Sequence, residues 1–166
     1  MVAQIVCRMI PVAEDRKDLA QDIYLRAFHK LSGFKFQSKL STWIAQIAYN
    51  ACLSWIEKKK PVLSDTLTES DFYIVSEDGD YNSATCHNES EDRLFKKELG
   101  AILHKEINRL PVVYQTLITL YHQEAMSYDD LGQITGLPAG TVKSYLFRAR
   151  KMLKENLLSK YKKEAL

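Results

Sequence analysis

The chain has 166 residues, 46% of them hydrophobic and 27% charged, which is typical of an ordinary soluble protein of one domain or two small ones. No apolar run approaches the roughly 20 residues that a membrane-spanning helix needs. The apolar-rich start, residues 1–13, lacks the basic beginning of a secretory signal. We therefore expect no membrane insertion and a cytoplasmic protein.

The net charge of +2 hides two basic segments. Counting Lys and Arg against Asp and Glu gives +5 for residues 1–60, −9 for 61–92 and +6 for 93–166. Two basic segments flanking an acidic one suggest two surfaces that meet a polyanion, although such charges are also common in proteins that never bind nucleic acid.

Two amphipathic helices are expected in the first 60 residues. Apolar residues at helical spacing mark a helix over 18–31, and a second one runs from Leu40 to about Ile56, ended by three lysines and Pro61. The apolar stripe expected to face the core in the first helix comprises Leu19, Ala20, Ile23, Tyr24, Ala27, Phe28 and Leu31. Leu25 lies off this stripe.

Residues 61–92 contain no Lys or Arg and show no sustained periodicity, which indicates a flexible acidic linker. Helical spacing resumes over 94–107 and again over 113–121, on either side of Leu110–Pro111. The chain is thus predicted to consist of two small helical domains, residues 1–60 and 93–166.

The end of the chain has the pattern of a helix-turn-helix. Ser127 and Asp130 are spaced like a capping box at the start of a short helix, and Gly136 interrupts that helix. Thr141 precedes a second helix whose apolar residues are Val142, Tyr145, Leu146, Ala149, Met152 and Leu153. No strand is needed, so the predicted fold class is all-α.

Three surfaces could bind a partner. The outer face of the last helix is cationic and rich in donors, which suits a DNA major groove, although a solvated basic face is the simpler reading of the charge alone. On the 18–31 helix, Leu25 stands among polar residues, which suggests a protein-docking spot, although single exposed leucines are common. The loop 34–39 holds two phenylalanines among lysines. It could stack unpaired bases, or at least one ring could fold back onto Trp43.

No catalytic or metal-binding pattern is present. The four histidines are scattered, and no phosphate-binding loop, HExxH or GxSxG occurs. Cys7, Cys52 and Cys86 form no CxxC pair, so we expect reduced thiols, with Cys52 in the core, and Cys86-His87 is too little for a metal site. We expect no catalytic residue, no metal and no cofactor, and hence no enzyme.

Several segments resemble the extracytoplasmic-function group of RNA polymerase sigma factors. Residues 18–27 are similar to region 2.2 of that family, and residues 38–50 to its regions 2.3 and 2.4. Residues 110–153 resemble region 4, with Leu110-Pro111, Ser127 to Leu131, Gly140 to Ser144 and Arg148 to Lys151 at the family's spacing.

The resemblance implies a function and its residues. The chain would bind core RNA polymerase through its β′ clamp coiled coil and β flap, and it would recognise and melt promoter DNA. An anti-sigma factor would be a further partner. The implied polymerase-binding residues are Asp18, Gln21, Asp22 and Leu25. The implied −10 contacts are Phe34, Lys35, Phe36, Ser38, Lys39, Thr42, Trp43 and Asn50. The implied −35 contacts are Ser127, Thr141, Lys143, Ser144, Phe147, Arg148 and Lys151.

In the family, the linker is thought to run toward the RNA path, and a soluble tether is equally compatible with residues 61–92. The segment before Asp18 is shorter than the family's first helix, so a truncated N-terminus is expected. The alternative function is a helix-turn-helix regulator that binds duplex DNA without polymerase. It requires only the second domain, and the resemblance of the first domain argues against it.

Overall fold

The computed structural model describes residues 1–59 and 91–161, and within these ranges the protein is helical with no strand, which confirms the all-α prediction. The α-helices are α1 (Val2–Met9), α2 (Ala13–Lys30), α3 (Leu40–Lys59), α4 (Glu91–Ile107), α5 (Val112–His122), α6 (Tyr128–Thr135) and α7 (Ala139–Tyr161). A 3-10 turn, η1 (Leu31–Gly33), follows α2. Most of the predicted linker, with Cys86 and His87, lies outside the described residues, and α4 begins within its last two positions.

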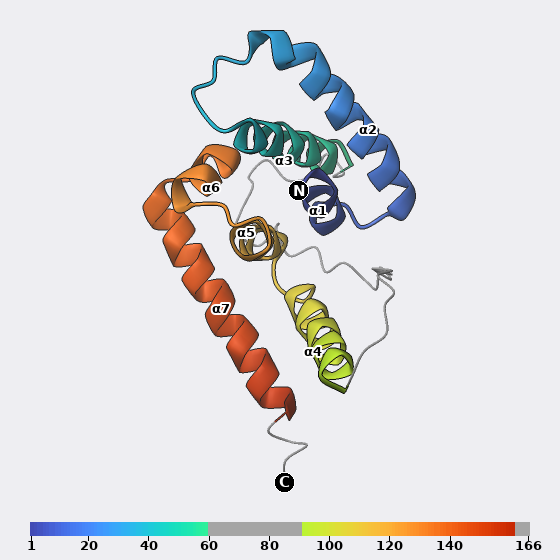
Figure 1. Ribbon diagram of the computed structural model, residues 1–166, viewed down its shortest axis with the longest axis vertical. Helices are drawn as coiled ribbons and strands as arrows, with labels where there is room; N and C mark the ends of the chain where they lie inside the picture. Colours follow the sequence, from blue (N-terminus) through green and yellow to red (C-terminus); the bar gives the residue numbers. More distant parts are fainter. Residues whose placement is uncertain (60–90, 162–166) are drawn as a thin grey trace.

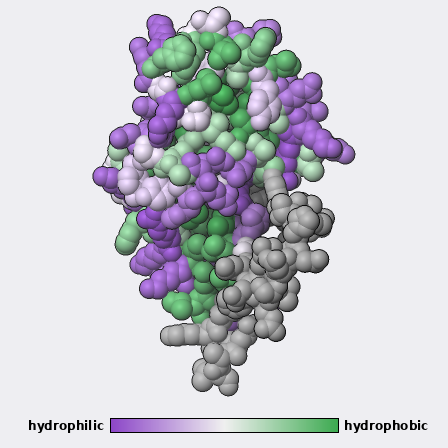
Figure 2. Space-filling model, in the orientation of Figure 1, coloured by the Kyte–Doolittle hydropathy of each residue, from purple (hydrophilic) through white to green (hydrophobic). Residues whose placement is uncertain are grey.

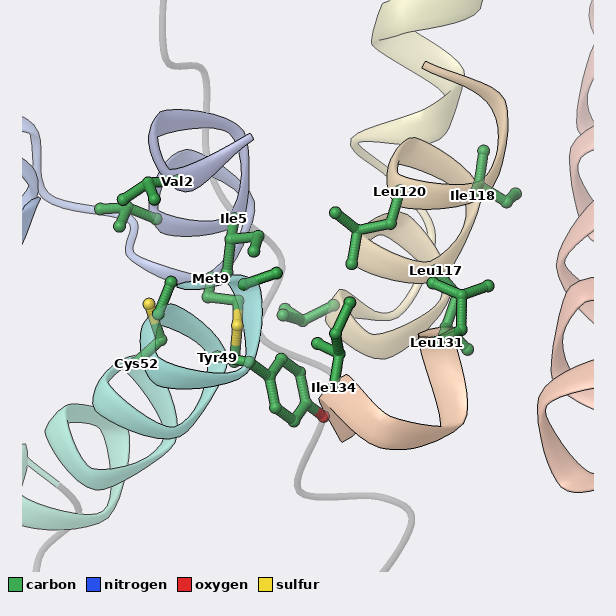
Figure 3. Close-up of a cluster of buried hydrophobic side chains, with 14 of the residues drawn as sticks. Val2, Ile5, Met9, Tyr49, Cys52, Leu117, Ile118, Leu120, Leu131 and Ile134 are labelled. Atoms are coloured by element: carbon green, nitrogen blue, oxygen red, sulfur yellow. The ribbon is translucent and has the colours of Figure 1, made fainter. Parts of the chain in front are cut away.

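The helices of the first 60 residues pack directly against the C-terminal helices. In Figure 1, α5 lies beside α1, and α6 lies against the start of α3, while α4 and α7 extend away from them. Buried side chains of α1, α3, α5 and α6 form one continuous apolar cluster. Figure 3 shows Ile5 and Met9 of α1 facing Leu120 of α5, and Tyr49 of α3 reaching toward Ile134 of α6.

Helix α1 was not predicted as an element. Its apolar residues Val2, Ile5, Val6 and Met9 are all buried, because α1 is packed between α2, α3 and α5. The lone Arg8 does not interrupt this packing, since its guanidinium donates a hydrogen bond to the Asn108 side chain just after α4. An isolated helix of this length would be marginal in water, so its tertiary contacts stabilise it.

The predicted core stripe of α2 is wider than the buried one. Only Leu19, Ile23 and Ala27 are buried, at a spacing of four residues that follows one side of the helix. Tyr24, Phe28 and Leu31 are exposed, so their assignment to the core was wrong. The reason is that α2 lies at the edge of the molecule and is covered only by α1 and α3 (Figure 1).

The helix-turn-helix forms as predicted. The Ser127 hydroxyl accepts a hydrogen bond from the Asp130 N–H, and the Asp130 carboxylate accepts one from the Ser127 N–H, which completes the capping box. Helix α6 ends at Gly136, whose φ of 74° is the left-handed conformation that closes many helices. Helix α7 buries Val142, Leu146 and Ala149 and continues beyond the predicted stripe to Tyr161.

A buried carboxylate joins α4 to α7. Glu106 is 1% exposed and accepts hydrogen bonds from the Lys160 ammonium at 2.5 Å and from the Arg109 guanidinium at 3.1 Å. The hydrogen bond from Lys160 lowers the pKa of Glu106, against the opposing effect of burial. The carboxylate therefore stays charged and holds the far part of α7 beside α4.

The turn between α6 and α7 supplies a test of this fold. Gly136→Ala should lower the free energy of unfolding by about 1 kcal/mol, because a Cβ is disfavoured at positive φ. Gly140→Ala, in the first turn of α7, is the matched control and should be neutral or stabilising by roughly 0.5 kcal/mol. Urea unfolding followed by circular dichroism gives both values. Equal losses in the two variants would contradict the left-handed turn.

Candidate nucleic-acid and protein interfaces

The outer face of α7 is exposed along its length. Lys143, Ser144, Phe147, Arg148 and Lys151 are all on the solvent side, opposite the buried stripe. Phe147 is 69% exposed, so this basic face also presents an aromatic ring. Thr141, at the start of the helix, is only partly exposed. The face can donate hydrogen bonds to phosphates and base edges and can make an apolar contact.

A cation–aromatic cluster that the sequence did not reveal borders this face. The rings of Tyr121 and Tyr128 stack with their centroids 5.1 Å apart. The Arg150 guanidinium lies 5.1 Å from the centre of the Tyr121 ring, and the Lys143 ammonium lies 5.5 Å from that of Tyr128. These residues come from three helices, so sequence spacing could not have brought them together. They widen the basic surface toward α5.

The polar face of α2 carries more apolar surface than the sequence predicted. Asp18, Gln21 and Asp22 are exposed, and so is Leu25, as expected. The additional exposed side chains are Tyr24, Phe28 and Leu31, and Phe28 is 75% exposed. Leu25 is therefore not a single exposed leucine but one member of an apolar strip bordered by carboxylates, which is the pattern of a protein-docking surface.

The loop after α2 contains a row of three aromatic rings. Phe34 is partly buried between its neighbours, with ring centroids 5.1 Å from Trp43 and 4.8 Å from Phe36. Phe36 is 85% exposed and has a φ of 54°, an uncommon conformation for an aromatic residue. The packing alternative thus holds for Phe34, whereas Phe36 leaves its ring accessible. Lys35 beside it is exposed.

The first turns of α3 lie against α6. Thr42 is buried, and its hydroxyl donates a hydrogen bond of 2.8 Å to the Asp130 carboxylate. The Lys39 ammonium lies 3.2 Å from the other oxygen of that carboxylate. The Gln46 amide donates to the carbonyl of Gln133 at 2.9 Å. Two of the predicted −10 contacts, Lys39 and Thr42, are therefore engaged by the helix-turn-helix, while Asn50 is exposed on the same helix.

Asp130 is charged despite being buried. Burial would raise its pKa, but hydrogen bonds from Ser127, Thr42 and Lys39 outweigh that effect and lower the pKa to about 2. Ser127, a predicted −35 contact, takes part in this network, since its hydroxyl lies 2.7 Å from the Asp130 carboxylate.

Other candidate chemistry is sparse. Cys52 is buried as predicted, and burial raises its thiol pKa to about 12, so it is a core residue and a poor nucleophile. Within residues 1–59 and 91–161, no group of three or more His, Cys, Asp and Glu side chains is placed to hold a metal ion. In the same ranges, no helix has the length and apolar character required to cross a bilayer.

Two family models match the chain. That for sigma-70 region 2 matches residues 1–62, and that for sigma-70 region 4 matches residues 101–153. The chain is 31% identical over 157 residues to the RNA polymerase sigma-H factor of Pseudomonas aeruginosa, covering 92% of this chain and 78% of the relative. It is 29% identical over 163 residues to the ECF RNA polymerase sigma factor SigW of Bacillus subtilis, covering 94% and 82%.

Solved structures share the fold. The sigma factor RpoE of Bartonella quintana, in complex with the anti-sigma factor NepR, has a TM-score of 0.69 at 24% identity, covering 94% of this chain and 89% of that one. CnrH in complex with the cytosolic domain of CnrY has a TM-score of 0.59 at 18% identity, covering 95% and 80%.

A helix-turn-helix joined to a helical domain with region 2 features defines a sigma-70 type transcription initiation factor. Within that class, the chain belongs to the extracytoplasmic-function sigma factors. It directs promoter recognition and the initiation of transcription with core RNA polymerase. The expectation of a sigma factor is thereby confirmed.

The Asp130 network makes stability depend on acid. Its pKa is about 2 in the folded chain against an ordinary 3.8, so the stabilisation is complete above about pH 4 and is lost as the pH falls toward 2. From pH 5 to pH 2, the wild type should lose about 2 kcal/mol more of its free energy of unfolding than Asp130→Asn does. Urea unfolding at each pH measures this difference. A constant gap between the two proteins would contradict the proposed charge state.

Proposed function

We propose that the exposed strip of α2 is the surface that docks on the β′ clamp coiled coil of core polymerase. Asp18, Gln21, Asp22 and Leu25 form its polar edge and first apolar contact. Tyr24 and Phe28 extend the contact, because they are exposed beside these residues without any apolar cover from the described helices. This strip is the observation that carries the proposal, since a free-standing DNA-binding regulator has no need of it.

The loop and first turns of α3 are proposed to take the −10 element. Phe36 offers an exposed ring for an unpaired base, with Phe34 and Trp43 stacked behind it. Lys35, Ser38, Lys39, Thr42 and Asn50 supply donors for phosphates and bases. Unstacking a base costs a few kcal/mol and stacking on an aromatic ring returns about 1 to 3 kcal/mol. A few such contacts therefore suffice to hold an opened strand.

The helix-turn-helix is proposed to bind the −35 element, with α7 in the major groove. Its contacts are Lys143, Ser144, Phe147, Arg148 and Lys151 on α7, together with Thr141 and Ser127 at the ends of the turn. The functional domains would be residues 1–60 and 93–166, connected by 61–92, and the second domain would also contact the β flap.

The cellular setting follows from this role. The chain would act in the cytoplasm, where core polymerase lies, and would contribute binding energy rather than catalysis. Two structures of similar fold contain a bound inhibitory partner or regulatory domain. We extend this to the present chain and propose an anti-sigma factor as its regulator.

The docking surface is tested by Asp22→Arg. The residue is exposed on α2, so the charge reversal should abolish co-elution with bacterial core polymerase in gel filtration while leaving the circular dichroism spectrum unchanged. Glu57→Arg, an equally exposed reversal at the far end of α3, is the control and should still co-elute. If neither the wild type nor the control co-elutes while the wild type binds duplex DNA, the regulator alternative is the better account.

The −35 surface is tested by Lys143→Ala and Arg148→Ala. Each should weaken binding to −35 duplex DNA, and each lost phosphate contact should flatten the slope of log affinity against log salt by about one unit. Lys105→Ala, an exposed lysine on α4, should change neither quantity. Unchanged affinity and slope in both α7 variants would remove this helix from the DNA interface.

A further inference from the structure

The −10 surface and the helix-turn-helix cover one another in this structure. Thr42 is 1% exposed because α6 lies over it, and its hydroxyl donates to Asp130 at 2.8 Å. Lys39 pairs with the same carboxylate at 3.2 Å, and Gln46 bonds to the α6 backbone at 2.9 Å. All three donors belong to the first two turns of α3 or the residue just before it.

We propose that the Asp130 carboxylate is an internal substitute for a DNA phosphate, which occupies the Lys39 and Thr42 donors and keeps the −10 surface closed until DNA displaces it. The proposal rests on the proposed function, since it takes Lys39 and Thr42 to be DNA contacts. An ammonium and a hydroxyl are donors that proteins commonly offer to phosphate oxygens. A carboxylate presents charged acceptor oxygens to the same donors.

The separation of the two promoter elements requires this contact to open. The −10 and −35 elements are about 25 base pairs apart by their names, which corresponds to about 85 Å of B-DNA. In the structure, the start of α3 and the start of α6 are in hydrogen-bond contact through Thr42 and Asp130. A chain in this arrangement cannot place α3 on one element and α7 on the other.

The position of Asp130 makes it an effective competitor. Its carboxylate is fixed to α6 by the Ser127 backbone and side chain, at 3.2 and 2.7 Å, so little conformational freedom is lost when it meets α3. The same hydrogen bonds keep it charged, as its lowered pKa shows. Because Lys39 is largely exposed and Thr42 is buried, the hydroxyl contact resists salt better than the ion pair does.

Asp130→Asn tests the proposal, with Asp129→Asn as the matched control. Both changes remove one negative charge from the first turn of α6, but Asp129 is exposed and lies one position away from the contact. An asparagine at 130 keeps an oxygen that can accept from the Ser127 N–H, so the helix remains capped. Thermal melts of both variants verify that they fold.

Two measurements on the full chain, without polymerase, decide the outcome. Hydrogen exchange of the α3 and α6 amides should become faster at both surfaces in Asp130→Asn, because the closed form is less populated. The same variant should bind a fluorescein-labelled single-stranded oligonucleotide of randomised sequence about tenfold more tightly, the factor expected when a charged hydrogen bond no longer competes. Asp129→Asn should change neither exchange nor this difference in affinity.

Unchanged exchange in Asp130→Asn would overturn the proposal, and so would faster exchange with an affinity equal to that of Asp129→Asn. The proposed function fails separately. If Lys39→Ala in the Asp130→Asn background leaves DNA affinity unchanged while exchange stays fast, Lys39 is not a DNA contact, although Asp130 still holds the two surfaces together.

Discussion

The hydrogen-bonded carboxylate of Asp130 connects local structure to tertiary structure in this protein. A buried charge is costly unless donors surround it, and here they come from both sides. Ser127 supplies them from the same helix, which caps α6, and Thr42 and Lys39 supply them from α3. The start of the helix-turn-helix and its placement against the first 60 residues therefore depend on one side chain.

The apolar cluster has the same dual character. Ile5 of α1 and Tyr49 of α3 share a core with Leu120 of α5 and Ile134 of α6, so the two promoter-binding parts are not independent bodies in this arrangement (Figure 3). Figure 2 shows further hydrophobic surface toward α4 and α7, where Leu99, Leu103 and Leu158 are exposed. Apolar surface left uncovered in this way suits a chain that works inside a larger assembly.

Much of the fold followed from local signals. Capping by Ser127 and the left-handed Gly136 depend on residues a few positions apart, so the sequence predicted the helix-turn-helix correctly. Helix α1 was missed because eight residues give too few turns for a periodic signal. The stripe of α2 was drawn too wide, because apolar spacing does not tell which flank of a helix a neighbour covers.

The candidate sites divide along the same line. Exposure of Leu25 and of the basic residues of α7 could be predicted from helix periodicity. The contact of Thr42 with Asp130, or of Arg150 with Tyr121, joins residues 88 and 29 positions apart and depends on how helices pack. The burial of α1 against α5 has a further consequence during synthesis. The ribosome completes α1–α3 about 50 residues before it begins α5, a delay of several seconds at roughly 5–20 residues per second. Nascent chains therefore present Ile5, Met9 and Tyr49 without their later partners, which makes this stretch a natural binding point for chaperones.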